Sequence, residues 1–116
     1  KGSAQINPEA MKASAGALNR IAVCRVSQLQ DAYKQLQING LSIFASSLDA
    51  KESMESCDFS VPCALVLGAE ESGIGSTTLR VADRLFSIPM QGETDSLNVS
   101  VAAGVMLYEV QRQRKV

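Results

Sequence analysis

The sequence contains no histidine, and its acidic and cysteine residues show no metal-ligand spacing. The three cysteines, Cys24, Cys57 and Cys63, are odd in number and include no C-x-x-C pair. This argues against both a disulfide framework and a zinc site. We therefore expect reduced thiols, with Cys24 and Cys63 in or beside apolar strands, and no bound metal.

Long apolar runs are also missing, and no stretch has the charged-then-apolar form of a secretory signal. The net charge is only −1 and the isoelectric point is about 5.4. This charge argues against a domain that binds nucleic acid by bulk positive charge alone, and an RNA-binding surface would be local or would lie on another domain or subunit. With 46% hydrophobic residues in 116, the chain is expected to be one globular, cytoplasmic domain without membrane contact.

The start of the chain lacks an initiator methionine and leads directly into a helix signal. Asn7 is placed to cap this helix, Pro8 suits its first position, and Glu9 lies in its first turn. We expect that further residues precede Lys1 in the natural protein.

Helical and strand-like segments alternate along the rest of the sequence, which predicts an α/β fold with a mostly parallel sheet flanked by helices. Strand signals are β-branched or uniformly apolar runs. Helix signals are longer segments that follow a short polar residue. The predicted strands are residues 21–26, 41–45, 64–67 and 85–88; the predicted helices are residues 10–18, 27–38, 76–83 and 97–112, with Ser27 and Ser76 as caps and one helical turn within 49–56.

Two of the predicted strands end in loops with unusual residues. Residues 65–75 run from an apolar strand into glycine and acid, and residues 88–98 run through a turn into a helix that opens with Ser96-Leu97-Asn98. Since ligands of such sheets bind at the carboxyl ends of the strands, we expect both loops to line one pocket. Without histidine or a metal cluster, this pocket would consist mainly of backbone groups and hold a cofactor that carries its own reactivity.

Neither loop matches a known phosphate-binding motif. Residues 68–73 lack the lysine of the nucleoside-triphosphatase loop and contain Glu70 and Glu71, which would repel phosphate. Residues 73–75 lack the third glycine of the dinucleotide fingerprint. The pattern disfavours a general nucleotide-binding domain and suits a cationic or neutral ligand.

Residues 66–74 and 88–102 resemble the second and third motifs of the SpoU (TrmH-like) branch of the SPOUT RNA 2′-O-ribose methyltransferases. Residues 3–7 and 12–17 are also similar to this branch, particularly to its bacterial 23S rRNA guanosine-2′-O-methyltransferases. The resemblance therefore covers nearly the whole chain. It implies a C-terminal trefoil knot, a homodimer through the C-terminal helix, bound S-adenosylmethionine, and an RNA substrate, with rRNA as first choice and tRNA as second.

The same resemblance implies roles for individual residues. The adenosine part of the cofactor would contact mainly the backbone of Gly68, Ile88 and Leu97. Residues near the reacting ribose would be Glu70, Ser96 and Asn98, which are the candidate catalytic residues. The full set implied for cofactor binding is Leu67, Gly68, Glu70, Gly73, Ile88, Met90 and Leu97.

Ordinary structural roles stay open for several of these residues. The glycines at 68 and 73 are also typical of turns, and Ser96 is a suitable helix cap. Met90 and Leu97 could be core residues. By contrast, Asn98 just inside a helix is poorly explained by helix propensity, which favours a functional role.

The first motif of the family, which contains an asparagine and an arginine, would lie upstream of Lys1. Its arginine is usually assigned to assist deprotonation of the ribose hydroxyl, and Arg20 and Arg25 fall in a different segment. We therefore expect residues 1–116 to be a single, truncated methyltransferase domain that presents most of the cofactor pocket but does not turn over alone. The alternative is a non-catalytic module that binds RNA or cofactor.

The C-terminal helix carries apolar residues on more than one face. We expect one side to pack on the sheet and another, with Met106 and Tyr108 offering large contact areas, to pack on a second copy. Residues 112–115 are predicted to be a solvated helix end whose positive charge suits the helix dipole.

Overall fold

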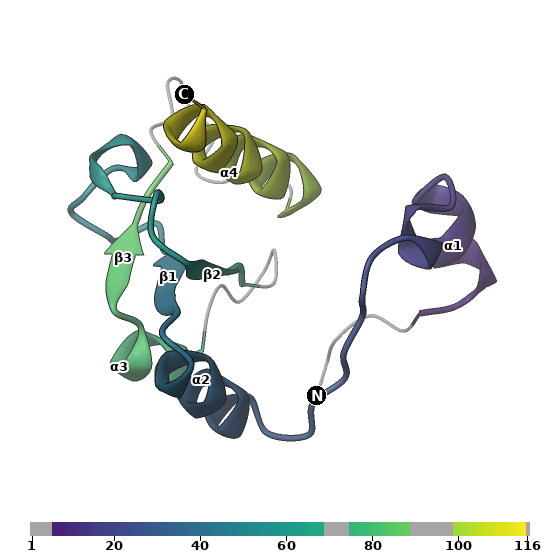
Figure 1. Cartoon of the computed structure of the whole chain (residues 1–116), viewed down its shortest axis with the longest axis horizontal. Coiled ribbons are helices and arrows are strands. Elements are labelled where there is room, and N and C mark those ends of the chain that lie inside the picture. The colour runs from purple at the N-terminus through teal and green to yellow at the C-terminus, as the bar shows by residue number, and fades with distance from the viewer. Residues whose placement is uncertain (1–5, 69–74, 89–98, 116) are drawn as a thin grey trace.

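Three short parallel strands form the sheet at the centre of the molecule (Figure 1). They are β1 (Ser42–Ser46), β2 (Cys63–Val66) and β3 (Arg84–Phe86), in the order β2-β1-β3. The structure is a computed structural model that describes residues 6–68, 75–88 and 99–115. Because β1 pairs in parallel with both neighbours, all three strands end at the same edge, as expected for the predicted parallel sheet.

Helices flank this sheet on both sides (Figure 1). The helices α2 and α3 lie next to each other and to β1, whereas α4 packs on the other side together with a short 3₁₀ turn, η2. In the described part of the chain, no helix is long and apolar enough to cross a membrane. The helical elements are α1 (Pro8–Ala13), η1 (Ala17–Asn19), α2 (Leu29–Ile38), η2 (Met54–Ser56), α3 (Ser76–Val81) and α4 (Val99–Arg114).

The main hydrophobic core lies between the sheet and α4. Phe59 is at its centre, with its ring centroid 4.9 Å from that of Phe44 and 5.7 Å from that of Phe86. Met106 of α4 closes the core from above and is fully buried, as is Phe59. Tilted and edge-on aromatic pairs add to the stabilisation from apolar burial.

The opposite face of β1 holds α2 and α3. The buried hydroxyls of Tyr33 and Thr78, 2.6 Å apart, join these two helices. The start of β3 is fixed by Asp83, whose backbone N–H donates to the carbonyl of Ile43 and whose carboxylate accepts from the backbone N–H of the same residue, at 2.8 and 2.7 Å. These contacts set the position of β3 next to β1.

The N-terminal helix begins as the sequence predicts, because the side chain of Asn7 accepts a hydrogen bond of 2.8 Å from the backbone N–H of Ala10 and Pro8 takes the first helical position. Its predicted extent to residue 18 is wrong. The helix ends at Ala13, since Ala15 and Gly16 adopt left-handed conformations with φ of +54° and +83°, and a separate 3₁₀ turn follows.

The predicted strand at residues 21–26 is also wrong. This segment links η1 to α2 along the outside of the molecule (Figure 1), and no residue in the described ranges pairs with it as a strand. Ile21 is 62% exposed, and Cys24, which we expected in or beside an apolar strand, is exposed as well. A β-branched sequence makes a strand only where a neighbouring strand supplies hydrogen bonds.

The two predicted serine caps are not confirmed. The N-cap residues of α2 and α3 are Gln28 and Gly75, and neither makes a side-chain capping bond. Ser27 lies before its helix, and Ser76 is already the first residue of α3. The C-terminal end of α2 agrees with the sequence, since Asn39 caps it and Gly40 follows with φ of +88°.

Replacement of the central core side chain, Phe59→Ala, is expected to reduce the free energy of unfolding by about 3–5 kcal/mol, because it leaves a cavity between two other rings. Urea unfolding monitored by circular dichroism measures this. The control Leu48→Ala shortens a side chain that is 66% exposed, and its effect should stay within about 0.5 kcal/mol. Equal losses in the two variants would contradict this description of the core.

Candidate functional site

The loops that follow β2 and β3 leave the sheet at one edge, on either side of β1. Strand β2 continues into Leu67 and Gly68, and β3 continues through Ser87 into Ile88. Two strand spacings separate these exits, which is a distance of about 10 Å. The sheet therefore brings three of the sequence-predicted site residues, Leu67, Gly68 and Ile88, to a common edge.

The side chains at these exits point into the protein. Leu67 and Ile88 are half-buried and pack against the core under α4, and Gly68 has no side chain. The backbone is therefore the part of these residues that a ligand at the edge can contact. Gly68 has no Cβ that would keep a ligand away from its backbone.

The other predicted site residues lie outside the described residues. The last of these residues in the sequence, Asn98, is directly followed by Val99, where the described part of α4 begins. Residues 89–98, which belong to the segment predicted to form the knot, also lie outside the described residues, so the knot stays a prediction. The six residues concerned are Glu70, Gly73, Met90, Ser96, Leu97 and Asn98.

A cavity of about 250 Å³ lies elsewhere, beside the loop between β1 and β2. Its walls include the starts of β1 and β3, at Ser42 and Arg84, and Glu52 and Cys57. An ion pair of 3.3 Å joins Arg84 and Glu52, but both side chains are about half exposed, so it adds little stability. Of the predicted site residues that the structure describes, Leu67, Gly68 and Ile88, none lines this cavity. No group of three or more potential metal ligands occurs in the described ranges.

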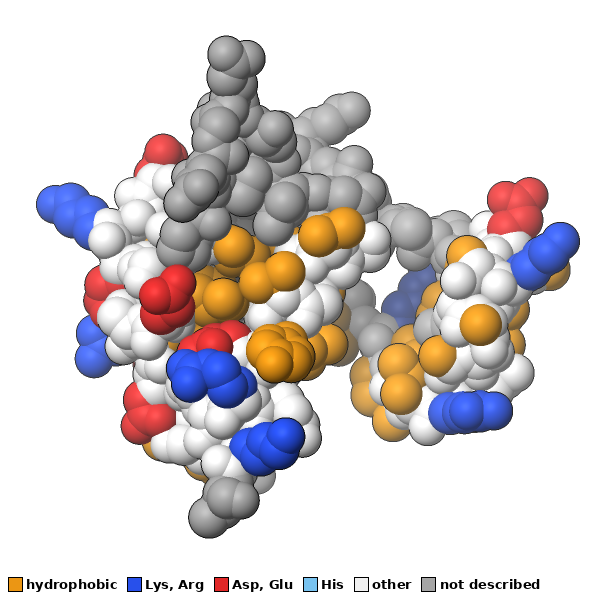
Figure 2. Space-filling view, turned by 90° about the horizontal axis from the view of Figure 1, so that it is seen from above, with side chains coloured by type: hydrophobic (Ala, Val, Ile, Leu, Met, Phe, Trp, Pro, Cys, Tyr) orange, Lys and Arg blue, Asp and Glu red, His pale blue; other side chains and the backbone are white. Residues whose placement is uncertain are grey.

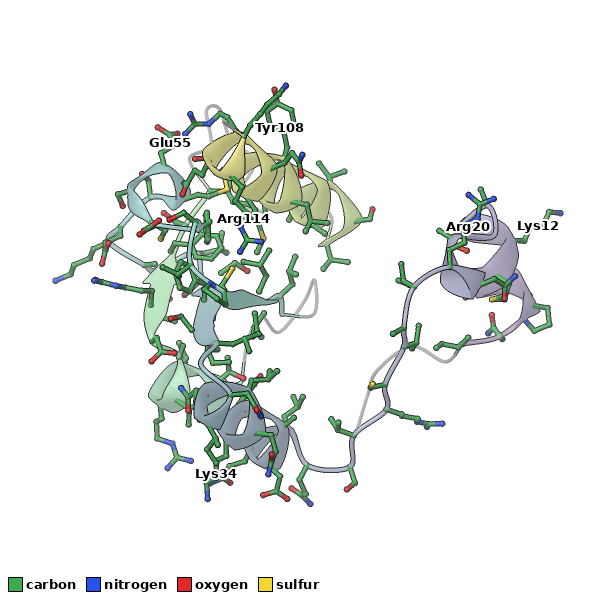
Figure 3. All side chains as sticks on the ribbon, viewed as in Figure 1. Lys12, Arg20, Lys34, Glu55, Tyr108 and Arg114 are labelled. Carbon is green, nitrogen blue, oxygen red and sulfur yellow. The ribbon has the colours of Figure 1, made fainter. Side chains whose placement is uncertain are left out.

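The C-terminal turn of α4 forms an extensive set of hydrogen bonds that the sequence did not predict. Gln113 accepts from the backbone N–H of Phe59 at 2.7 Å and donates to the carbonyl of Cys57 at 2.9 Å. Arg114 donates to the carbonyls of Phe59 and Val61 at 2.9 and 2.8 Å. Figure 3 shows Arg114 between α4 and the sheet. The two side chains thus bind four backbone groups of the loop that precedes β2.

Glu109 supports this arrangement from within α4. Its side chain is buried, and its carboxylate accepts two hydrogen bonds from Arg112, at 2.8 and 2.7 Å, and one of 2.8 Å from Gln113. The bonds from Arg112 and then Gln113 lower the pKa of Glu109 from 4.5 to about 2. We call Glu109, Arg112, Gln113 and Arg114, with the loop 57–61 that they hold, the C-terminal clamp.

The interpretation of residues 112–115 as a solvated helix end is therefore wrong for Gln113 and Arg114, which bind the neighbouring loop, whereas the side chain of Arg112 is 58% exposed. Arginine and glutamine at the end of a helix look the same in a sequence whether they face water or a neighbouring loop. The packing of Met106, Val105 and Val110 on the core places this turn next to residues 57–61. The ion pair of Glu109 and Arg112 could have been predicted, because opposite charges three positions apart are a typical helical ion pair.

Comparison with known proteins decides the family. Residues 1–108 match the family model described as the SpoU rRNA Methylase family. The chain belongs to the SpoU rRNA methylase family. It is 40% identical over 114 residues to the 23S rRNA (guanosine-2′-O-)-methyltransferase RlmB of Ralstonia nicotianae, which covers 98% of this chain and 46% of the relative. The RlmB of Xanthomonas axonopodis is 43% identical over 112 residues, which covers 97% and 45%.

Solved structures of SpoU proteins have the same fold. A crystal structure of an RNA 2′-O ribose methyltransferase superimposes with a TM-score of 0.89 at 28% identity, over 98% of this chain and 45% of the other. The A. aeolicus TrmH/SpoU tRNA modifying enzyme gives a TM-score of 0.87 at 32% identity, over 98% and 57%. The SpoU methyltransferase AviRb of Streptomyces viridochromogenes, solved with the cofactor AdoMet, gives 0.84 at 28% identity, over 93% and 45%. This SpoU chain spans less than half the length of the two curated relatives.

For the SpoU chain, the low pKa of Glu109 predicts a specific acid dependence of stability. A carboxyl whose pKa is lower in the folded than in the unfolded state stabilises the fold above about pH 4.5, and this contribution disappears as the pH falls towards 2. The difference in unfolding free energy between the natural chain and Glu109→Gln should therefore shrink over that range in urea titrations.

The control Glu9→Gln removes an exposed carboxylate from α1 and should change stability little at any pH. A Glu109→Gln difference that stays constant down to about pH 2 would show that the C-terminal clamp does not hold an ionised carboxylate.

Proposed function

We propose that this chain is part of an S-adenosylmethionine-dependent RNA 2′-O-ribose methyltransferase that acts on a guanosine of 23S rRNA. The main support is the common edge at which β2 and β3 end, because the two loops that resemble the family motifs begin there. The 40–43% identity to proteins named 23S rRNA guanosine methyltransferases supports the substrate. A tRNA substrate is the second choice, since the tRNA modifying enzyme is 32% identical.

The cofactor pocket is proposed to form around the exits of β2 and β3. Gly68 and Ile88, with Leu97, would hold the adenosine through backbone groups, while Leu67, Gly73 and Met90 would complete the walls. The inward packing of the Leu67 and Ile88 side chains supports this assignment, since it leaves their backbone at the edge. When bound, S-adenosylmethionine supplies a methyl group that is already activated by a positively charged sulfur.

The chain's own task is then to position the ribose and handle its proton. Glu70 is proposed to orient the donor region or a cationic partner, and Ser96 and Asn98 to bind the nucleotide. In-line alignment of the ribose hydroxyl is the larger part of this task, and correct positioning can supply several kcal/mol of rate enhancement. The resemblance assigns help with deprotonation to an arginine of the first motif, which these 116 residues do not contain.

A homodimer through α4 is part of the same proposal. The side of α4 away from the sheet leaves Val101 at 51%, Leu107 at 60% and Tyr108 at 72% exposure. The expectation that Met106 would also face a second copy is wrong, because its side chain is fully buried in the core of this chain. Figure 3 shows Tyr108 pointing away from the sheet, and Figure 2 shows hydrophobic side chains on that face. An exposed apolar helix face of this kind is typical of a subunit interface.

The cofactor proposal predicts that S-adenosylmethionine binds to the 116-residue chain and that Gly68→Val prevents this, because the branched side chain fills the space next to the backbone. Isothermal titration calorimetry measures the affinity, and a loss of at least about tenfold is expected. The control Ala64→Val adds the same kind of bulk to the beginning of β2 and should bind like the natural chain.

A methylation assay with rRNA and radiolabelled donor completes this test. Binding without turnover is expected, because the proposal assigns deprotonation of the ribose hydroxyl to an arginine upstream of Lys1. Turnover by the chain would contradict the role given to that arginine. The non-catalytic alternative would be supported if RNA is retained but the donor does not bind.

The dimer proposal predicts that Tyr108→Asp converts the chain to a monomer at micromolar concentration, because a charge would be buried in the interface. Sedimentation velocity measures this directly. Leu48→Asp, which places the same charge on an exposed apolar residue outside α4, should remain dimeric. A natural chain that sediments as a monomer would refute the dimer.

A further inference from the structure

We propose that Gln113 and Arg114 are positioning residues for the donor pocket, although they lie at the far end of α4 from it. This inference rests on the proposed function, because the pocket that they position is the proposed S-adenosylmethionine pocket. It assigns a role in the binding geometry to residues that make no contact with the donor.

The C-terminal clamp holds the loop that leads into β2. Gln113 and Arg114 bind backbone groups of Cys57, Phe59 and Val61, and β2 begins only two residues later, at Cys63. Arg114 also lies 3.7 Å from the sulfur of Cys63 itself. The start of β2 is therefore fixed to the end of α4 by side-chain hydrogen bonds.

The other ends of these two elements lead to the proposed pocket. Strand β2 ends at Val66, which is followed by Leu67 and Gly68, and α4 is described from Val99, directly after Leu97 and Asn98 in the sequence. The C-terminal clamp thus connects two of the segments that carry proposed site residues. The clamp makes this connection at the start of β2 and the end of α4. The proposed site residues, in contrast, follow the end of β2 and precede the described start of α4 in the sequence.

The geometry gives the size of the effect. A helix of 16 residues is about 24 Å long, so a tilt of only about 3° at the clamp moves its beginning by about 1 Å. Binding constellations need their groups held to within about 0.5 Å of the productive geometry, so a shift of about 1 Å is expected to weaken donor binding. Hydrophobic packing of Met106, Val105 and Val110 holds α4 on the sheet, but such contacts are non-directional and permit small tilts.

Directional hydrogen bonds in the C-terminal clamp make the orientation of α4 specific. Gln113 uses its oxygen for the N–H of Phe59 and its nitrogen for Cys57 and Glu109. Arg114 uses two nitrogens for two different carbonyls, which a lysine cannot reproduce. These directional bonds fix the rotation and tilt of α4 relative to the loop before β2.

The test compares Gln113→Glu with Gln111→Glu. The first removes both donor bonds of Gln113 and places a second carboxylate next to Glu109; the second makes the same chemical change at an exposed residue of the same helix. We expect S-adenosylmethionine to bind about tenfold or more weakly to Gln113→Glu, and with unchanged affinity to Gln111→Glu. Affinities are measured by calorimetry at a temperature at which circular dichroism shows each variant to be fully folded.

A purely structural role predicts a different result, namely a lower melting temperature with unchanged donor affinity of the folded protein. That result would overturn the proposal. Should Gln113→Glu fail to fold, Arg114→Lys decides, because it keeps the charge and one bond; it is expected to bind the donor several times more weakly, and unchanged affinity in this folded variant would also overturn the proposal.

Hydrogen exchange without donor separates this proposal from the proposed function. Gln113→Glu should accelerate amide exchange at residues 63–68 relative to Gln111→Glu, and equal exchange would refute positioning. If the natural chain does not bind S-adenosylmethionine at all, the proposed function fails, while the exchange data still decide whether the C-terminal clamp positions the exit of β2.

Discussion

Parallel pairing of β1 with both of its neighbours is the constraint on which the rest of the structure depends. In a sheet with the order β2-β1-β3, it brings the ends of β2 and β3 to one edge, although Val66 and Phe86 are twenty positions apart in the sequence. The two loops that carry the family motifs can form one pocket only because of this pairing. An antiparallel β3 would place Ile88 at the opposite edge from Gly68.

The core under α4 supports the proposal that a ligand at this edge is bound through backbone groups. Phe44 and Phe86 face α4 together with Phe59, and the half-buried side chains of Leu67 and Ile88 extend the same core towards the edge. Side chains that are used for packing leave peptide groups for a ligand. Such a site needs little side-chain chemistry, which agrees with a sequence that has no histidine and with a donor that carries its own activated group.

Local signals in the sequence were sufficient to predict most helices and strands. They were not sufficient to predict which other parts of the chain these elements contact. The cap at Asn7, the glycine after Asn39 and the apolar runs of β1 and β2 predicted helix and strand ends to within a few residues. The β-branched residues 21–26 were misleading because strand formation depends on a partner that the described residues do not provide. The roles of Gln113 and Arg114 were invisible because their hydrogen bonds reach residues more than fifty positions away.

The central claim is that backbone groups at the exits of β2 and β3 bind S-adenosylmethionine. A titration of the ¹⁵N-labelled chain with S-adenosylhomocysteine, followed by amide resonances, tests it most directly. The account predicts saturable shifts of the amides of Gly68 and Ile88, while those of Tyr33 and Thr78, on the other side of the sheet, stay in place. Shifts confined to the cavity near Cys57, or no shifts at saturating ligand, would contradict it.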